Sequence, residues 1–419
     1  MKVLVIGGGG REHAIVWKLS QSPKIDKLYC APGNGGISKI AECVPIKVID
    51  IEGIINFSKN EKIDFVFVAP DDPLALGLVD ALENAGIRAF GPSKKAAVIE
   101  SSKVFSKALM KKYGIPTADY ETFNDMNTAL VYLKHINFPV AVKADGLALG
   151  KGVILCDDYA EAVKAVEEMM LNKAFGDAGN EIIIEEYLYG PEVTVLAFMD
   201  GKTVVPMVSS QDHKRALDND MGLNTGGMGA FSPSRIYTYE LAAYCMKKIF
   251  IPSMEAMNSE DMKFKGVIYF GLMITKDGPK VIEYNARFGD PEAQVTLFKL
   301  KTDLLEIADA IIDEKLDTVN IEWSEEVAAC VVIASGGYPE NYDKGFEITG
   351  IDNAEKDSDI VVFHAGTTLS DGKYITNGGR VLGVTAKGAT HDEAIKKAYE
   401  GVKQISFKNM QFRNDIGIK

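Results

Sequence analysis

Short apolar runs alternate with amphipathic stretches along the first hundred residues. The runs KVLVIG (2–7), KLYCAP (27–32) and DFVFVAPDDP (64–73) have apolar cores, as strands buried on both faces do. Between them, HAIVWKLSQS (13–22) and LALGLVDALENAG (74–86) place apolar residues at helical spacing. Apolar strands that alternate with helices and end in Gly, Pro or Asp predict a doubly wound parallel sheet, which binds ligands at the carboxyl ends of its strands.

The pattern then changes to short strands around one helix, followed by a long polar tract. SKVFSKALMKKYG (102–114) predicts a helix that ends at Gly114. A small mixed unit follows, with strands at 139–145, 151–157 and 181–188 and a helix at 159–171. The tract at 209–234 is polar and glycine-rich with little apolar periodicity, and so long a loop is usually functional or disordered.

A hairpin and a small module complete the chain. GVIYFGLMIT (266–275) and PKVIEYNARFG (279–289) flank the sequence KDG, whose Asp and Gly are turn residues, so we expect two antiparallel strands. The last ninety residues, from AACVVIASGG (328–337) to the helix at 391–405, read as an α/β or α+β module. A chain of 419 residues is too long for one ordinary core, so we expect two to four domains.

Composition and charge exclude several classes of partner. Hydrophobic residues make up 47% of the chain and charged residues 25%, which is typical of a soluble globular protein. The 46 basic and 59 acidic residues leave a net charge of -13, so neither nucleic acid nor an anionic membrane is the expected partner. Five scattered cysteines and the lack of a long apolar run favour a reducing compartment, and we expect a cytoplasmic protein.

Two glycine-rich segments invite a nucleotide interpretation. The loop VIGGGGREHA (5–14) does not fit the spacing G-x-G-x-x-G, which disfavours NAD, although its backbone N–H groups and Arg11 can face a phosphate. A tight turn that only packs is the alternative. The segment KADGLALGKGVIL (143–155) has Gly152 where a Walker loop needs Ser or Thr, so its phosphate-binding geometry must be a different one.

The segment KVIEYNARFGDPE contains a candidate metal site. Glu283 and Asn285 lie two residues apart on an expected strand and therefore share one face, with Arg287 next along it if the strand continues. A carboxylate and an amide oxygen suit magnesium that is shared with substrate phosphates. The alternative is that Glu283 is a solvated strand residue. This alternative is less favoured because three further charged residues crowd the same stretch, namely Arg287, Asp290 and Glu292.

The polar tract carries further candidate chemistry. SSQDHKR (209–215) offers side chains that bind anions and ammonium groups, and the glycines of NTGGMGAFSP (224–233) allow a backbone to approach a ligand closely. A surface loop of mixed charge is the alternative interpretation. Outside the tract, Glu185 and Glu186 follow three isoleucines, and carboxylates on a buried strand are costly unless they are hydrogen-bonded or reach a site.

Taken in order, these motifs resemble the ATP-grasp enzymes, and within them the phosphoribosylamine-glycine ligases. The motifs are VIGGGGREHA, APGN, KADGLALGKGV, SSQDHKR, NTGGMGAFSP and EYNARFGDPE, and the resemblance covers essentially the whole chain. The resemblance implies ATP-dependent ligation of glycine to 5-phosphoribosylamine through glycyl phosphate, with Mg²⁺ or Mn²⁺, in de novo purine biosynthesis. It also implies a monomer or small homo-oligomer with a doubly wound N-terminal domain (1–102), an ATP-grasp small unit (103–192), an ATP-grasp large unit (193–327) and a C-terminal domain (328–419).

The resemblance also implies a role for particular residues. Those expected to bind ATP are Lys103, Lys143, Gly146, Gly150, Lys151, Gly152, Glu186, Leu188 and Glu192. Those expected to face glycine and phosphoribosylamine are Gly8, Gly9, Gly10, Arg11, Asn34, Asp212, Lys214, Gly226, Gly227, Arg287 and Asp290. Among these, the residues expected to be catalytic are Asp212, Arg287 and Asp290. Glu283 and Asn285 are the expected metal ligands.

Two positions depart from the pattern of the family, and three other functions compete with this one. Pro191 stands where another acidic residue is usual, so the ribose contact depends on Glu192 alone, and Leu149 stands where a small residue is commoner. A different ATP-grasp enzyme, either a carboxylase or a ligase for another amine, would not need SSQDHKR and NTGGMGAFSP. A nicotinamide oxidoreductase is disfavoured by the glycine spacing, and a non-catalytic nucleotide sensor would not need a substrate loop beside a metal pair.

Overall fold

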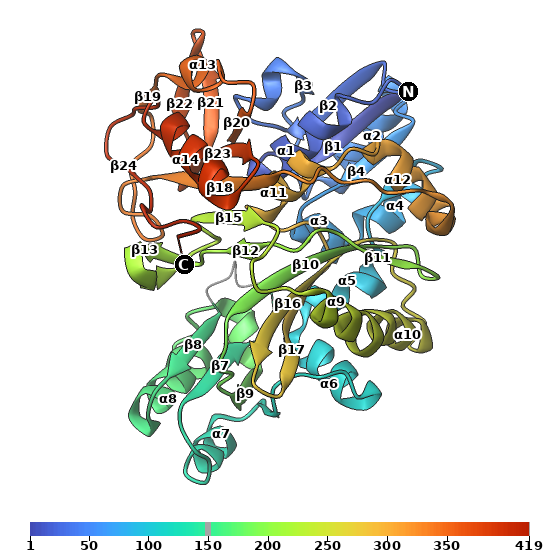
Figure 1. Cartoon of the computed structure of the whole chain (residues 1–419). Helices are drawn as coiled ribbons and strands as arrows, with labels where there is room; N and C mark the ends of the chain where they lie inside the picture. The colour runs from blue at the N-terminus through green and yellow to red at the C-terminus, as the bar shows by residue number, and fades with distance from the viewer. Residues whose placement is uncertain (147–151, 419) are drawn as a thin grey trace.

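The structure is a computed structural model that describes residues 1–146 and 152–418. Its N-terminal domain is built on a parallel sheet (Figure 1). Its strand order is β3-β2-β1-β4-β5, and every pair is parallel. The strands are β1 (Lys2–Gly7), β2 (Lys27–Pro32), β3 (Glu42–Cys43), β4 (Phe65–Val68) and β5 (Arg88–Phe90). The helices are α1 (Gly10–Leu19), α2 (Ile51–Glu61), α3 (Asp71–Leu76), α4 (Leu78–Asn84) and α5 (Lys94–Ser101).

The buried strands explain why the doubly wound sheet could be predicted. Residues 3–6 of β1 and 65–68 of β4 are buried throughout, as expected for strands covered on both faces. The helix expected at 74–86 is instead two helices, because Gly77 adopts a positive φ of 90° between α3 and α4. This break turns the chain before it enters β5.

A small four-stranded unit lies at the bottom of the molecule in Figure 1. Its strand order is β6-β9-β7-β8, and all neighbours are antiparallel. The elements are α6 (Lys103–Tyr113), β6 (Tyr120–Phe123), α7 (Met126–Leu133), β7 (Val140–Ala144), β8 (Val153–Cys156), α8 (Tyr159–Val166) and β9 (Ile182–Glu186). A π-helical turn at Glu167–Leu171 extends α8 to the end expected from the sequence. The unit has its own apolar core, which α7 and α8 share with β7 and β9.

A second antiparallel sheet joins the small unit to the body. Its order is β11-β10-β16-β17, and its last two strands form the expected hairpin. The elements here are β10 (Glu192–Met199), β11 (Val204–Pro206), α9 (Tyr239–Cys245), α10 (Ile251–Ser259), β16 (Gly266–Thr275), β17 (Gly278–Asn285), α11 (Glu292–Lys299) and α12 (Leu304–Ile312), with a π-helical turn at Met246–Phe250. One apolar core contains residues of this sheet and of the N-terminal sheet, so the two pack together.

The polar tract at 209–234 is not an irregular loop along its whole length. It forms β12 (Gln211–Asp212), β13 (Arg215–Leu217), β14 (Met221–Asn224) and β15 (Gly229–Ser232), and β12 and β15 extend the C-terminal sheet to β12-β15-β18-β23-β20. These strands are too short to show an apolar period.

The other C-terminal elements are β18 (Val327–Ser335), β19 (Glu347–Ile348), α13 (Ile351–Ala354), β20 (Ile360–His364), β21 (Thr367–Ser370), β22 (Lys373–Thr376), β23 (Arg380–Gly388), α14 (His391–Val402) and β24 (Met410–Gln411). Helix α14 packs against β18 and β23. Among the helices of the described ranges, none has the length and apolar character needed to cross a bilayer.

Candidate active site

One face of the second sheet carries the expected metal ligands. The register pairs Thr194 and Glu283 with Gly271 from either side, and it pairs Tyr269 with Asn285 one row further on. Directly paired residues in antiparallel strands share a face. Gly271 has no side chain, and the Glu283 side chain and the Tyr269 ring fill the space above it: a Cβ at this position would lie 3.0 Å from Glu283 Cγ and 3.3 Å from Tyr269 Cε1.

Cations from four segments of the chain converge on Glu283. Partial burial opposes the ionisation of this carboxyl, but Lys214, Lys143, Lys103 and Arg287 together lower its pKa below the ordinary value. Lys214 lies nearest, with Nζ 3.9 Å from Glu283 Oε1. The carboxylate is therefore charged at neutral pH, with four cationic side chains near it that could also offset the charge of a polyphosphate.

The donors at Glu283 and Asn285 fit a hard divalent cation. Each offers oxygen from the same face of β17, and Asn285 Oδ1 at present accepts a hydrogen bond from Arg287 Nη2 at 3.2 Å. In the part of the chain that the structure describes, no group of three or more His, Cys, Asp or Glu could hold a metal. A cation here would therefore take its other ligands from substrate oxygens, as magnesium commonly does.

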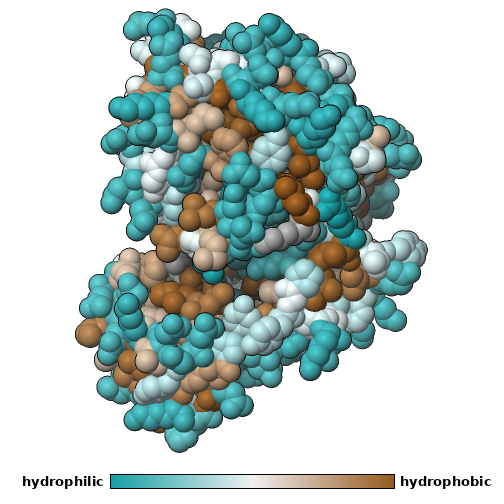
Figure 2. All heavy atoms as spheres, turned by 60° about the vertical axis from the view of Figure 1, so that its left-hand side comes forward, coloured by the Kyte–Doolittle hydropathy of each residue, from teal (hydrophilic) through white to brown (hydrophobic). Residues whose placement is uncertain are grey.

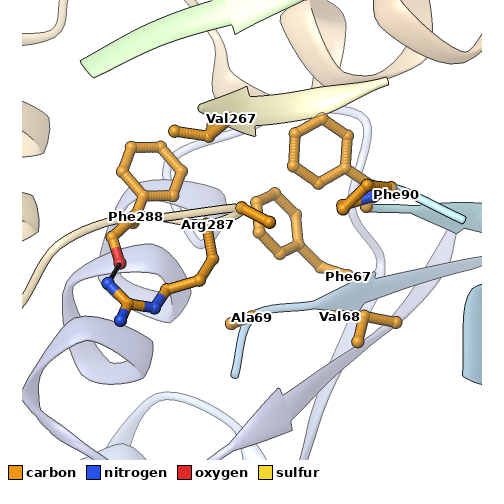
Figure 3. Close-up of a pocket in the computed structure, with 10 residues that line it drawn as sticks. Phe67, Val68, Ala69, Phe90, Val267, Arg287 and Phe288 are labelled. Carbon is orange, nitrogen blue, oxygen red and sulfur yellow. Dashed lines mark hydrogen bonds between the residues drawn. The ribbon is translucent and has the colours of Figure 1, made fainter. Parts of the chain in front are cut away.

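Arg287 lies beyond the strand and not on it. Strand β17 ends at Asn285, and the guanidinium turns back to make a 2.7 Å ion pair with Glu100. Phe288 packs against Phe67, so the backbone at this point is fixed by an apolar contact with β4, as Figure 3 shows. Arg287 Nε is buried and has no hydrogen-bond partner among the described residues.

The start of the glycine-rich segment is tied to helix α6. Lys103 Nζ donates to Gly146 O at 2.7 Å, and the Asp145 carboxylate accepts a hydrogen bond from Val104 N at 3.0 Å. Where the segment returns, Ala144 N donates to Gly152 O. Gly146 and Gly152 therefore lie where β7 and β8 leave and re-enter the sheet. The expected ATP contacts Gly150 and Lys151, and the departure at Leu149, lie outside the described residues.

Lys143 belongs to a buried charge cluster that includes one residue the sequence did not single out. Glu185 makes ion pairs with both Lys143 and Lys107, and all three side chains are less than 10% exposed. Burial lowers the pKa of both lysines. The unusual carboxylate after three isoleucines was the only sequence signal for this cluster, and nothing indicated Lys107 as its partner.

The remaining expected ATP residues line the junction of the small unit and the second sheet. Glu186 ends β9 and pairs with Lys280 at 2.6 Å. Leu188 follows it and is half-buried, and Glu192 begins β10 and pairs with Lys214 at 2.6 Å. Figure 2 shows the surface hollowed between the lower lobe, which is the small unit, and the body above it.

Asp212 shares its surroundings with Glu292, a residue for which the sequence predicted no role. Partial burial raises the pKa of Asp212 to about 8; Lys214 opposes the shift, and the charge of Glu292 adds to it. Burial also raises the pKa of Glu292, whose Oε1 lies 3.4 Å from Thr194 Oγ1. Two carboxyls so arranged titrate as a pair and hold a proton near neutral pH.

The N-terminal glycine loop lies on the opposite side of the site from the lysines of the small unit. Gly9 N donates to Glu12 Oε2 at 2.6 Å, and Arg11 Nε donates to Glu12 Oε1 at 2.6 Å. Arg11 Nη1 also reaches Phe288 O at 3.3 Å, which links the loop to the segment after β17. This geometry places a helix N-terminus and a guanidinium beside each other, as an anion site requires.

Asn34 and Asp290 complete this side. Asn34 Nδ2 donates to Gly8 O at 2.9 Å and to His364 O at 2.8 Å, so it joins the loops after β1 and β2 to the C-terminal sheet. Asp290 Oδ1 lies 3.3 Å from the position that a Cβ on Gly10 would occupy. Asp290 is thus brought against the glycine loop; that both segments face substrate stays a prediction.

Comparisons with known proteins cover the whole chain. Family models for phosphoribosylglycinamide synthetase match it in three parts: the N domain at 1–100, the ATP-grasp (A) domain at 101–293 and the C domain at 328–419. A phosphoribosylamine–glycine ligase of Caldanaerobacter subterraneus is 48% identical over 99% of each chain.

Solved structures agree with this match. A phosphoribosylamine–glycine ligase of Thermotoga maritima superimposes with a TM-score of 0.87 at 31% identity, covering 99% of this chain and 100% of that one. The biotin carboxylase domain of a Hydrogenobacter thermophilus carboxylase superimposes with a TM-score of 0.73 at 17% identity over 98% of this chain and 91% of that one, a likeness of fold alone.

Proposed function

The chain belongs to the phosphoribosylglycinamide synthetase family, and from that premise we propose how its residues share the work of the reaction. It is an ATP-dependent ligase that joins glycine to phosphoribosylamine in purine biosynthesis, with ADP and phosphate as the other products. The observation that carries the assignment of residues is the convergence of Lys103, Lys143 and Lys214 on Glu283.

The side of the site that carries Lys103 and Lys143, called the lysine side, binds the nucleotide. Lys103 and Lys143 face the phosphates, and Glu186, Leu188 and Glu192 lie where the small unit meets the second sheet. Glu283 and Asn285 would hold Mg²⁺ or Mn²⁺, which offsets the charge of the transferred phosphoryl group when bound. Gly150 and Lys151 stay predicted ATP contacts.

The arginine side of the site takes the second phosphorylated substrate. Arg11 and Arg287 place two guanidinium groups near Asp290, and the glycine loop adds backbone N–H groups. Guanidinium groups bind phosphate oxygens through paired hydrogen bonds, while a carboxylate suits an amine. Phosphoribosylamine carries a phosphate and an amine. Its phosphate would bind the guanidinium groups, and its amine would bind the carboxylate of Asp290.

Glycine lies between the two sides, where Asp212 and Lys214 are. A carboxylate is a poor acyl donor, so its oxygen first takes the γ-phosphoryl group of ATP to give glycyl phosphate. The amine of phosphoribosylamine then attacks the acyl carbon, the C–O bond to phosphate breaks, and the amine loses a proton. Asp212, whose pKa is raised to about 8, can accept that proton in its ionised form, which becomes dominant as the pH rises through about 8.

A coupled ADP-release assay across a panel of amino acids tests this assignment. Glycine with phosphoribosylamine should support ADP release, whereas alanine and serine should not. Steady ADP release that ignores the amino acid would contradict the ligase function. The domain boundaries at 102, 192 and 327, the monomer or small homo-oligomer and the cytoplasmic location stay predictions.

A further inference from the structure

An arginine from the C-terminal domain reaches the substrate side of the site, and the proposed chemistry gives it no part. Arg380 begins β23, nearly a hundred residues after Asp290 in the chain. Its Nη1 donates to Asp290 O and to Gly226 O, each at 2.6 Å, and its Nη2 donates to Asp290 Oδ2 at 3.0 Å. Only 20% of the side chain is exposed. One guanidinium therefore joins two segments that are expected to face substrate.

Asp290 is oriented through both of its carboxylate oxygens. Arg380 binds Oδ2, and Gln294 Nε2 donates to Oδ1 at 2.7 Å. The same carboxylate faces the N-terminal glycine loop, since Oδ1 lies 3.3 Å from a Cβ built on Gly10 and Oδ2 lies 3.7 Å from one built on Gly9. Its direction is thus fixed toward the loop by two hydrogen bonds.

The glycine turn of the polar tract is held from the C-terminal domain as well. Gly226 N donates to the Tyr338 hydroxyl at 3.2 Å, and Gly227 O accepts a further bond from Arg380 Nη1 at 3.3 Å. A Cβ on Gly227 would approach Pro291 Cδ to 2.6 Å, so the turn rests directly on the residue after Asp290. Arg380 therefore links the position of the turn to that of the Asp290 carboxylate.

We propose that Arg380 is a positioning residue by which the C-terminal domain shapes the phosphoribosylamine side of the site. It holds Asp290 and the turn at Gly226 and Gly227 against the N-terminal loop, where the amine of the substrate must arrive. Arg380 donates hydrogen bonds to four acceptors, the carbonyl oxygens of Gly226, Gly227 and Asp290 and the carboxylate of Asp290. The planar guanidinium of arginine has enough donors in a fixed geometry for this, whereas the ammonium group of lysine does not. The inference rests on the proposed function, because it uses the assignment of Asp290 and the turn to phosphoribosylamine.

Steady-state kinetics of Arg380→Gln and Arg380→Lys separate positioning from a general structural part. For Arg380→Gln, the KM for phosphoribosylamine should rise about 10- to 100-fold, the range that a lost charge-assisted hydrogen-bond group produces. The KM values for ATP and glycine should stay within about threefold of wild type, because the lysine side is untouched. Arg380→Lys should recover part of the loss. Lys387→Gln, on the same strand, is the matched control and should behave as wild type.

A double-mutant cycle with Asp290→Asn tests the link between the two residues. If Arg380 acts through Asp290, the loss in the double variant should be clearly smaller than the product of the two single losses. The affinity for the product glycinamide ribonucleotide, measured by calorimetry, should fall in Arg380→Lys and fall further in Arg380→Gln. This measurement gives a readout without turnover. Equal rises in all three KM values, independent losses, or unchanged kinetics in a folded Arg380→Gln would each overturn the inference. Wild-type enzyme that makes no glycinamide ribonucleotide in the same assay would instead refute the proposed function.

Discussion

Glu283 shows how a single residue's surroundings decide its chemistry. It is about one-third exposed, and lysines and an arginine from separate elements keep it ionised. A neighbouring amide oxygen on the same strand face makes a pair of hard donors from what the sequence shows as two isolated residues. The spacing of the pair could be predicted from a period of two, but the lysines around it could not, because they come from positions about 70 to 180 residues earlier in the chain.

Replacing Glu283 by Gln should weaken the metal site. The amide keeps the shape but loses the charge, so the Mg²⁺ concentration that gives half-maximal rate should rise about tenfold or more. Glu255→Gln, at an exposed position on α10, is the matched control. An unchanged Mg²⁺ requirement in Glu283→Gln would remove this residue as a ligand.

Asp212 should give the enzyme an acidic limb in its pH profile. With a pKa of about 8, the carboxyl is mostly protonated at pH 7 and ionises as the pH rises through 8, so kcat/KM should climb between about pH 7 and 9. In Asp212→Asn, this limb should disappear, with a fall of about 10²-fold or more in rate.

The same shift has a consequence for stability. Because the folded pKa lies above the unfolded value, the stability gained from protonated Asp212 is complete at low pH and is lost as the pH rises through about 8. Asp261→Asn, whose side chain is 99% exposed, is the control for both measurements. A profile that keeps its limb without Asp212 would assign the proton acceptor elsewhere.

At the scale of elements, the C-terminal segment clamps the β13–β14 hairpin that follows Lys214. Arg413 is fully buried; its Nη2 donates to Asp220 Oδ1 at 2.9 Å and its Nη1 donates to Arg215 O at 3.1 Å. Gly417 N adds a bond to His213 Nε2 at 3.2 Å. The hairpin thus depends on residues some two hundred positions away, which is why the sequence suggested only a loop there.

Arg413→Met should loosen this hairpin without unfolding the N-terminal sheet. Losing a buried cation that holds several acceptors costs about 2–4 kcal/mol. Amide hydrogen exchange of residues 215–224 should accelerate, while that of β1 and β4 stays unchanged. Arg88→Met removes a solvent-exposed pair and should cost under about 1 kcal/mol. Unchanged exchange in the hairpin would show that the clamp is not needed.

The glycine turn at 226–227 gives a second prediction at this scale. Gly227 has a φ of +110° and rests on Pro291, so Gly227→Ala combines backbone strain with a steric clash. We expect a cost of about 2–4 kcal/mol and a clear loss of activity. Gly86→Ala is the matched control, because its φ is +77° with no atom near the added methyl group. Equal losses in the two variants would show that the contact with Pro291 is unimportant.

The elements divide into those that a sequence can predict and those it cannot. Strands β1, β2 and β4 are apolar on both faces, so their pattern alone identified the doubly wound sheet. Strands β12 and β15 are only two and four residues long. They pair with each other, and β15 also pairs with β18 far along the chain, so local pattern gave no signal. The same limit hid Lys107 and Arg380, whose partners become neighbours only in the fold.

At the scale of the whole molecule, an acidic chain brings cationic side chains together at one site. The chain carries -13 overall, yet the site gathers lysines on one side and arginines on the other. The N-terminal sheet and the second sheet share one apolar core, while the C-terminal domain reaches the site through Arg380. The proposed site therefore draws on residues from every part of the chain, and family models match the chain in three parts.

The fate of the glycine carboxylate oxygens tests the proposed chemistry most directly. Glycine labelled with ¹⁸O in its carboxylate, incubated with ATP, phosphoribosylamine and the enzyme, should transfer one labelled oxygen to each phosphate released. This follows because the oxygen that attacks the γ-phosphorus leaves with phosphate when the amine displaces it from the acyl carbon. Mass spectrometry of the phosphate gives the answer. Phosphate without the label, formed together with glycinamide ribonucleotide, would contradict activation of glycine as an acyl phosphate.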